Sequence, residues 1–248
     1  MPFVPVHCAA VLAGTWDREV GKVTVWYMYY GAGDTVVALA TAPLRTTTEP
    51  PFSSTSFETG QRLPDWVSEI DTSAPSSGGL ANVDGFPGYG LTAPETAMRS
   101  ETAHTGTTAL MYSGSAEGAP TDYAYTQVFD LSEAPVTVGP DTTLSYWIYP
   151  QSSAETGVSG DNSSCVALDM IFTDGTALRN SGAVDQNGNR LHPAYQCGQL
   201  ALDQWDYVTS DIGAVVSGKT ISRIDLGFDD PGGSGGYRGY IDDITLTP

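Results

Sequence analysis

The sequence predicts an all-β protein, a two-sheet β-sandwich or jelly roll with an N-terminal β-hairpin extension. The chain of 248 residues contains 28 glycines and 16 prolines, and no long amphipathic helical pattern runs through it. Short runs of alternating apolar and polar residues recur, separated by turn signals such as "TDGT", "DQNGNR" and "DDPGGSGG". Regular short strands joined by such turns are typical of a sandwich.

The N-terminal part differs in composition from the rest. Two β-rich runs within residues 21–42 flank "GAGD", which predicts a hairpin. Residues 1–45 are too few to bury a core alone, so we expect a hairpin extension or the tail of a preceding module. Residues 46–55 are rich in Pro, Thr and Ser and are expected to be a linker, which leaves residues 56–248 for the sandwich.

Strands of the sandwich follow from the same alternation. We expect them near 55–58, 65–71, 95–99, 107–113, 123–131, 142–149, 165–173, 177–184, 190–196, 205–212, 220–228 and 237–247. In "LSYWIYP" the alternation places Leu144, Tyr146 and Ile148 on one face and Ser145, Trp147 and Tyr149 on the other. In "YIDDITL" it places Tyr240, Asp242, Ile244 and Leu246 on one face and Ile241, Asp243 and Thr245 on the other.

The charge excludes some partners. Ten basic residues stand against 29 acidic ones, which gives a formal net charge of -19. Such a surface repels phosphate, so neither nucleic acid nor an anionic membrane is expected as a partner. No stretch of about 18 apolar residues is present, so no membrane span is predicted. The composition suits a secreted protein, a cation binder or a binder of neutral ligands.

Three cysteines, Cys8, Cys165 and Cys197, leave at least one without a partner in the chain. We expect a disulfide between Cys165 and Cys197, as in exported domains, with two buried thiols as the alternative. No CxxC or Cys/His cluster appears, so a zinc site is not expected.

Catalytic motifs are scarce. The chain has three histidines and lacks GxSxG, HExxH and a Walker loop, and His104 is expected to be a loop residue. A glycan hydrolase or lyase using paired carboxylates remains an alternative, with Asp229 or Asp230 opposite Glu95.

Two adjacent aspartates, Asp242 and Asp243, stand inside the last predicted strand. A carboxylate on the core side is costly unless it is paired, and a hard cation such as calcium removes that cost. Glu58 lies on the first strand of the sandwich, and first and last strands are often neighbours. The three acids therefore predict a calcium site, and the alternative is a charge pair on an edge strand that faces water.

Three segments together carry a resemblance: "SFETG", "ETAHTGTTALMYSG" and "GYIDDITL". In this order they resemble the galactose-binding-domain-like β-sandwich family, which includes many carbohydrate-binding modules. The resemblance implies one structural calcium, with Glu58 and Asp242 as side-chain ligands and Asp243 as a competing choice. It also implies backbone carbonyl ligands from the loop at 103–108, near His104 to Gly106.

Longer segments, among them "KTISRIDLGFDDPGGSGGYRGYIDDITLT", are similar to the N-terminal sandwich domain of family 92 glycoside hydrolases of the α-mannosidase type. No segment resembles the catalytic (α/α)-barrel of that family. Mannosidase activity is therefore not expected of this chain.

Sugar-binding sandwiches present aromatic rings to pyranose faces. We expect Trp147 and Tyr149 to form such a platform, with Tyr123 and Tyr125 lining the same sheet. Alternative contacts lie on loops: Phe86 and Tyr89 on one, Tyr237 and Arg238 on another. Trp66 and Trp205 are expected in the core.

Together these observations predict a non-catalytic carbohydrate-binding module with a structural calcium. We expect it to be secreted, to bind a neutral glycan and to be accessory to a glycoside hydrolase, beside a catalytic domain. A structural or adhesion sandwich without a sugar site is the main alternative.

Overall fold

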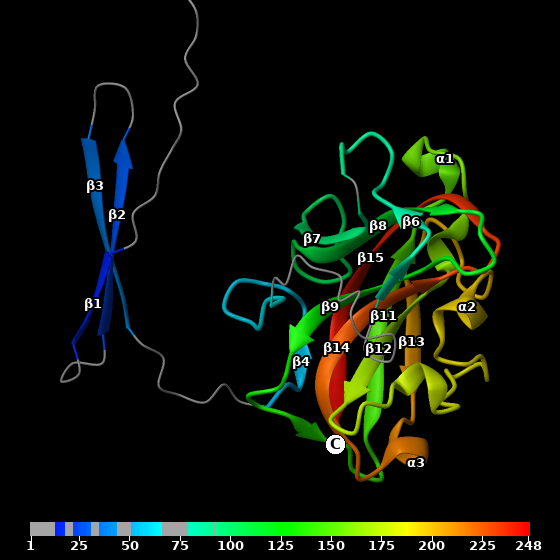
Figure 1. Cartoon of the computed structure of the whole chain (residues 1–248). Coiled ribbons are helices and arrows are strands. Elements are labelled where there is room, and N and C mark those ends of the chain that lie inside the picture. The colour runs from blue at the N-terminus through cyan, green and yellow to red at the C-terminus, as the bar shows by residue number, and fades with distance from the viewer. Residues whose placement is uncertain (1–12, 18–21, 31–34, 44–50, 66–78, 92) are drawn as a thin grey trace, which may run out of the picture. The chain divides into compact units, whose positions relative to one another are not determined.

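The computed structural model describes residues 13–17, 22–30, 35–43, 51–65, 79–91 and 93–248 (Figure 1). The chain divides into two compact units, Met1–Glu49 and Pro50–Pro248. In the described residues, no helix combines the length and the apolar character that a bilayer span requires.

The N-terminal unit is a three-stranded antiparallel sheet. It consists of β1 (Ala13–Asp17), β2 (Lys22–Tyr30) and β3 (Thr35–Pro43) in that order. Strands β2 and β3 are those of the predicted hairpin and pair from Lys22 opposite Pro43 to Tyr30 opposite Thr35. Strand β1 was not expected, and the turn "GAGD" lies outside the described residues.

The second unit is a two-sheet antiparallel β-sandwich, which confirms the predicted fold class. One sheet has the order β13-β11-β15-β8-β6, with β4 also on β15 and β7 also on β8. Its strands are β4 (Ser54–Thr55), β6 (Val83–Asp84), β7 (Glu95–Arg99), β8 (Ala109–Glu117), β11 (Thr143–Pro150), β13 (Asp206–Ser210) and β15 (Ser234–Thr247). Thus Ser54 and Thr55, in the stretch expected as linker, pair with the last strand.

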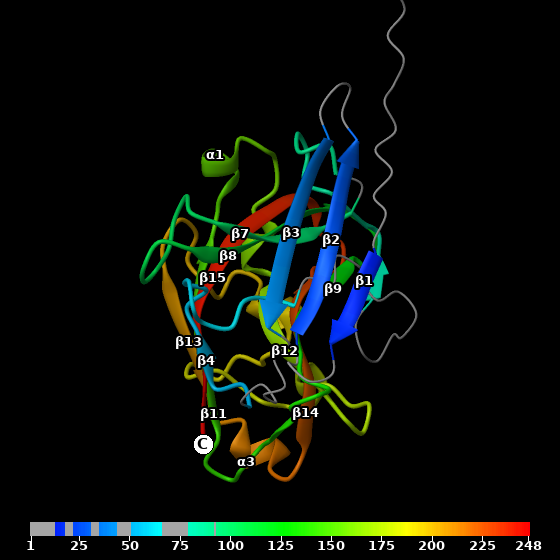
Figure 2. The same ribbon diagram turned by 90° about the vertical axis from the view of Figure 1, so that its left-hand side faces the viewer.

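The other sheet has the order β10-β14-β9-β5, with β12 also on β14. Its strands are β5 (Gly79–Ala81), β9 (Tyr123–Asp130), β10 (Val136–Thr137), β12 (Val166–Phe172) and β14 (Thr220–Asp229). Figure 2 turns the sandwich so that β13, β15 and β8 lie on the left and β12, β14 and β9 on the right.

The core lies between the two sheets. Leu144, Tyr146 and Ile148 of β11 are fully buried there, and Trp147 and Tyr149 are not, so the predicted alternation of this strand is confirmed. From the other sheet, apolar side chains such as Leu168 of β12 join the same cluster.

The last strand departs from simple alternation at Asp243. Its register against β11 shifts between Ser145 and Trp147, and Asp243 has a φ of 49°, in the left-handed region. This β-bulge exchanges the two faces of the strand. Ile241 is therefore in the core together with Ile244, whereas the sequence analysis wrongly placed them on opposite faces.

Short helices replace two predicted strands, those near 177–184 and 190–196. The short helical segments are α1 (Ser153–Thr156), η1 (Asn162–Ser164), η2 (Leu178–Asn180), α2 (Pro193–Gln196) and α3 (Gly213–Val216). In α2, Pro193 stands in the first turn and His192 precedes it as the N-cap, accepting a 3.2 Å hydrogen bond from the backbone of Ala194. Proline at this position favours a helix start over a strand.

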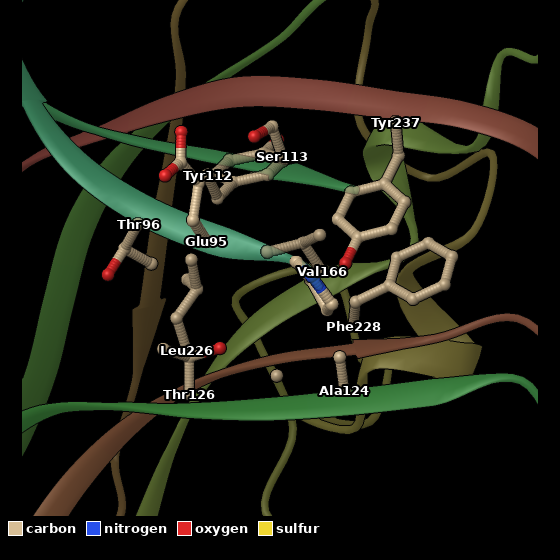
Figure 3. A pocket seen from close by; sticks show the side chains of 12 residues that line it. Glu95, Thr96, Tyr112, Ser113, Ala124, Thr126, Val166, Leu226, Phe228 and Tyr237 are labelled. Atoms are coloured by element: carbon tan, nitrogen blue, oxygen red, sulfur yellow. The ribbon is translucent and has the colours of Figure 1, made fainter. Parts of the chain in front are cut away.

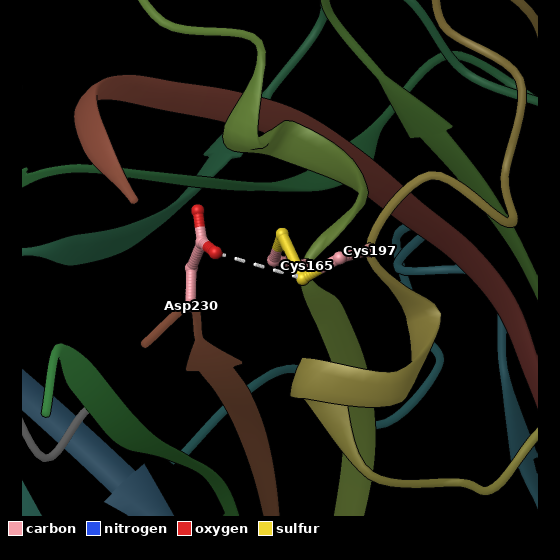
Figure 4. Close-up of side chains that lie close together, drawn as sticks. All are labelled: Cys165, Cys197 and Asp230. Carbon is pink, nitrogen blue, oxygen red and sulfur yellow. Dashed lines mark hydrogen bonds between the residues drawn. A yellow bond between two sulfur atoms is a disulfide. The ribbon is translucent and has the colours of Figure 1, made fainter. Parts of the chain in front are cut away.

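The predicted disulfide between Cys165 and Cys197 is formed, and it ties the end of η1 to the end of α2 (Figure 4). The Oδ1 atom of Asp230 lies 3.9 Å from the sulfur of Cys197. Within the described residues, these three side chains are the only trio of possible metal ligands whose ligand atoms all lie within 4.8 Å of one another. Because both sulfurs are in the disulfide, neither is available as a thiolate ligand.

We predict that Cys165→Ser lowers the free energy of unfolding by about 3–4 kcal/mol, because the bond closes a loop of 32 residues in the unfolded chain. Urea unfolding measures the change. Cys8→Ser is the control, since Cys8 belongs to the other unit and should leave the unfolding of the sandwich unchanged. Equal stability of Cys165→Ser and the parent protein would contradict the prediction.

Candidate functional site

Four aromatic rings gather on the outer face of the seven-stranded sheet. They belong to Trp147 and Tyr149 of β11, Tyr207 of β13 and Trp205 just before β13. We call these four residues the aromatic platform. Ring centroids lie 5.2 Å apart for Trp147 and Tyr207 and 5.5 Å apart for Tyr149 and Trp205.

Strand pairing explains why the rings meet. Trp147 lies opposite Tyr207 in the antiparallel ladder, and both side chains point away from the core. Neighbours on one face of paired strands are close enough for ring contact. Tyr207 is 44% exposed, so an apolar ligand face can reach the platform from solvent.

A small apolar cluster supports the platform from below. Tyr240 of β15 is 1% exposed and packs with Ala109 and Met111 of β8, and Tyr149 and Trp205 lie against them. The centroid of Tyr149 is 6.4 Å from that of Tyr240. The rings therefore stand on a packed base.

His104 connects the platform to the acidic residues at the end of the chain. Its ring stacks on Trp147 at 3.8 Å and 13°, and lies edge-on to Trp205 at 5.7 Å. Its Nδ1 atom is 2.7 Å from a carboxylate oxygen of Asp243. One loop residue thus contacts both the aromatic rings and the carboxylates.

Glu58, Asp242 and Asp243 converge on the loop of residues 104–108. We call these three residues the acid cluster. Asp242 accepts backbone hydrogen bonds from His104 (2.8 Å), Thr105 (3.1 Å) and Asp243 (2.8 Å). Glu58 accepts from the backbone of Thr107 (2.7 Å) and Thr108 (2.8 Å). Asp243 accepts a 2.6 Å bond from the Thr105 hydroxyl.

The three acids thus bond to neighbouring residues of one loop, and their bonding differs from the expectation. The loop directs N–H groups, rather than the implied carbonyl oxygens, at Glu58 and Asp242. Gly106 has a φ of 67°, and a Cβ at this position would lie 2.5 Å from the Glu58 carboxylate. Only glycine fits there without displacing that side chain.

The three carboxyl groups give the acid cluster an excess of negative charge. Asp242 is fully buried, and burial raises its pKa to about 6. Carboxylate oxygens are the ligands that calcium prefers, so the side chains present fit that ion. The three carboxylates do not form a trio within 4.8 Å, and a bound ion would have to draw them closer.

Arg238 and Tyr89 border the platform, beside Tyr240. The Arg238 guanidinium lies 5.4 Å from the ring of Tyr240 and 5.7 Å from that of Tyr89, which is 40% exposed. It also forms an ion pair with Glu101 at 3.6 Å. Two of the predicted loop contacts are thus on the same face as Trp147 and Tyr149.

Two other predicted contacts are wrong, because their side chains are buried. Phe86 is 4% exposed and Tyr237 is 3% exposed. Tyr237 stacks on Phe228 at 3.7 Å in the core. The glycines around both residues suggested exposed loops, but Tyr237 lies within the regular part of β15.

Tyr123 and Tyr125 lie on the other sheet, in β9, so the prediction that they line the sheet of Trp147 is wrong. The Arg179 guanidinium covers the Tyr125 ring at 4.1 Å, and this tyrosine is 4% exposed. Arg179 also pairs with the buried Asp169. This contact fastens η2 to the five-stranded sheet.

Sequence reasoning missed Trp205 and Tyr207. Trp205 was wrongly assigned to the core, and Tyr207 was not considered. The alternation in "WDYVTS" carries the signal, since Val208 is buried and Trp205 and Tyr207 are not. Trp66, the other tryptophan expected in the core, lies outside the described residues.

In the enzymatic alternative Glu95 stands opposite Asp229 or Asp230, and neither aspartate lines the cavity beside Glu95. Glu95 lines a cavity between the sheets together with Tyr112, Ser113 and Tyr237 (Figure 3). The cavity holds about 10 Å³, room for about one water molecule. Asp229 is on β14 of the other sheet, near Tyr125 and His192.

No family model matches the sequence, and no curated protein is significantly similar to it. Several solved structures overlap with the fold. One comes from a study of the promiscuous specificity of carbohydrate-binding modules of the β-sandwich superfamily, at 14% identity and a TM-score of 0.45, covering 92% of this chain and 74% of that one.

A second is the CBM22-1 xylan-binding domain of Paenibacillus barcinonensis Xyn10C, at 11% identity and a TM-score of 0.32, covering 78% of this chain and 92% of that one. A third is a β-1,2-glucanase from Parabacteroides distasonis, at 16% identity and a TM-score of 0.37, covering 62% of this chain and 22% of that one. These three similarities concern the fold alone. The likeness to family 92 domains stays a prediction.

We predict that Asp225 makes the sandwich less stable as pH rises. Burial raises the pKa of Asp225 to about 7, above the value of about 4 in an unfolded chain. The folded state therefore binds this proton more tightly, and its contribution to stability is lost as pH rises from about 4 to about 7.

Asp225→Asn should remove this contribution, so the difference in melting temperature between variant and parent should grow in favour of the variant from about pH 4 to about pH 8. The exposed Asp84→Asn is the control and should show no such trend. A difference between Asp225→Asn and the parent that does not vary with pH would contradict the assignment.

Proposed function

We propose that the protein is a non-catalytic module that binds a neutral glycan on the aromatic platform. The observation that carries this proposal is the set of four rings on one outward sheet face, held on a packed base. Aromatic rings stack on the C–H faces of pyranosides, and polar groups at their margin bind the hydroxyls.

Polar groups stand at the margin of the platform. The Tyr149 hydroxyl donates to Glu155 at 3.1 Å, and Arg238 lies beside Glu101. Acidic groups accept hydrogen bonds from sugar hydroxyls and repel acidic sugars. Because the protein carries a formal net charge of -19, a neutral glycan is a better ligand for it than a uronate or a sulfated chain.

We further propose that the module is secreted and accessory to a glycoside hydrolase. The disulfide supports an oxidising compartment. A weak binding module gains from linkage to a second module or to a catalytic domain, since linkage raises the effective concentration at the polysaccharide.

We predict that Tyr207→Ala weakens glycan binding at least tenfold, equivalent to about 1.4 kcal/mol, because it removes the most exposed ring of the platform. Affinity electrophoresis on soluble xylan, glucans and mannans measures the retention. Tyr195→Ala is the matched control, since Tyr195 is 53% exposed but belongs to α2 beside the other sheet.

Equal retention of the parent, Tyr207→Ala and Tyr195→Ala would contradict the platform. No retention on any neutral polysaccharide would favour the structural or adhesion role. Release of reducing ends from the same polysaccharides would favour the enzymatic alternative.

We also propose that the acid cluster binds calcium. The support is its excess of negative charge, with the buried Asp242 at its centre. A cation that binds only the folded state raises its stability, by about 2.7 kcal/mol at a hundred times the dissociation constant.

Calcium added to chelator-treated protein should therefore raise the melting temperature, and Glu58→Gln should reduce this increase. Glu117→Gln, an exposed acid on β8, is the matched control. An unchanged melting temperature in calcium, with no calcium found by elemental analysis, would contradict the site and leave the hydrogen bonds to the loop at 104–108 as the contacts of these carboxylates.

A further inference from the structure

A groove opens at the end of β13. It has a volume of about 440 Å³ and lies between the segment 182–186 and α3. This volume is in the range of small-molecule sites. Six of the residues that line it matter here: Thr143, Val184, Gln186, Thr209, Ser210 and Val215.

The groove continues the face that carries the aromatic platform. On β11 and β13, Trp147 pairs with Tyr207, and Ser145 pairs with Thr209 one step further along the same face. Thr143 follows after another two residues and lines the groove together with Thr209. The distance from Trp147 to Thr143 along the strand is about 13 Å, more than one pyranose ring covers.

Gln186 connects the groove to the aromatic platform at the edge of the sheet. Its side-chain amide donates to the carbonyl of Tyr207 at 2.6 Å and accepts from the backbone of Thr209 at 2.9 Å. The segment that forms one wall of the groove is thereby attached to the strand that carries a platform ring. These two hydrogen bonds fix the position of the groove relative to the platform.

Both apolar and polar side chains line the groove, as the binding of a sugar chain requires. Val184 and Val215 are 43% and 47% exposed and give the groove two apolar walls. Thr143 and Thr209 add hydroxyl groups on the outer face, whereas Ser210 lies opposite the core residue Leu144 and is buried.

We propose that platform and groove form one extended site, which binds an internal stretch of several units of a linear neutral polysaccharide. The inference rests on the proposed function and adds the ligand's length and shape to it. One end of the stretch stacks on the platform rings. The other end lies between Val184 and Val215, with its hydroxyls toward Thr143 and Thr209.

The test compares oligosaccharide lengths. Isothermal titration with cello-, xylo-, manno- and laminari-oligosaccharides, from disaccharide to hexasaccharide, should show affinity that increases about tenfold or more with length in the series that binds. Val215→Trp should fill the groove, abolish this increase and leave disaccharide binding unchanged. Val215 is exposed on α3, so a larger side chain there is compatible with folding.

The control is Leu63→Trp, which also enlarges an exposed apolar side chain (47% exposed) but next to a segment that bonds to β9 of the other sheet. The Leu63→Trp variant should bind oligosaccharides of every length with the affinity of the parent protein. Affinity that reaches its limit at the disaccharide, or a Val215→Trp variant that binds the hexasaccharide as the parent does, would overturn the extended site and leave the platform intact. Absence of binding in every series, and to the polysaccharides, would overturn both.

Discussion

The buried carboxylate of Asp242 accepts the hydrogen bonds on which the outer face of the seven-stranded sheet depends. It is fully buried and accepts three backbone N–H groups, two from the loop at 104–108 and one from Asp243. These bonds hold His104 in place, and His104 in turn stacks on Trp147. Hydrogen bonds to an ionised acceptor are stronger than those between neutral groups, and the low dielectric of a buried site strengthens them further. One side chain thus orders a loop and orients a ring of the platform.

The residue beside it explains why two aspartates occur in a strand. Asp243 takes the left-handed conformation at the bulge, which aspartate adopts more easily than β-branched or bulky residues. The bulge lets Ile241 and Ile244 both reach the core from the same strand. Without it, one of these isoleucines would face the outer side of the sheet, where Tyr240 and Asp242 now lie. Core packing and the acid cluster therefore depend on the same local irregularity.

Local patterns predicted much of the fold and only part of the site. Alternation correctly predicted the faces of β11, and the order of the motifs predicted that Glu58 and the last strand share the loop at 104–108. Alternation failed on β15 because a bulge shifts the phase, and its one mark in the sequence is an aspartate at the bulged position, Asp243. The spacing of Tyr123 and Tyr125 equals that of Trp147 and Tyr149, but spacing does not say to which sheet a strand belongs. Burial of Tyr237 depends on Phe228, which comes from the opposite sheet, and this tertiary contact is not visible in the sequence.

The bonds of Gln186 to β13 have a consequence for self-association. Strand β13 ends the order of its sheet, and an open strand edge is a template on which a second copy can add a strand. The Gln186 amide occupies a donor and an acceptor of that edge, at Tyr207 and Thr209. Copies brought together at high local concentration would be the most prone to such edge-to-edge pairing. A single side-chain amide thus covers part of the edge on which a second copy of the chain could pair.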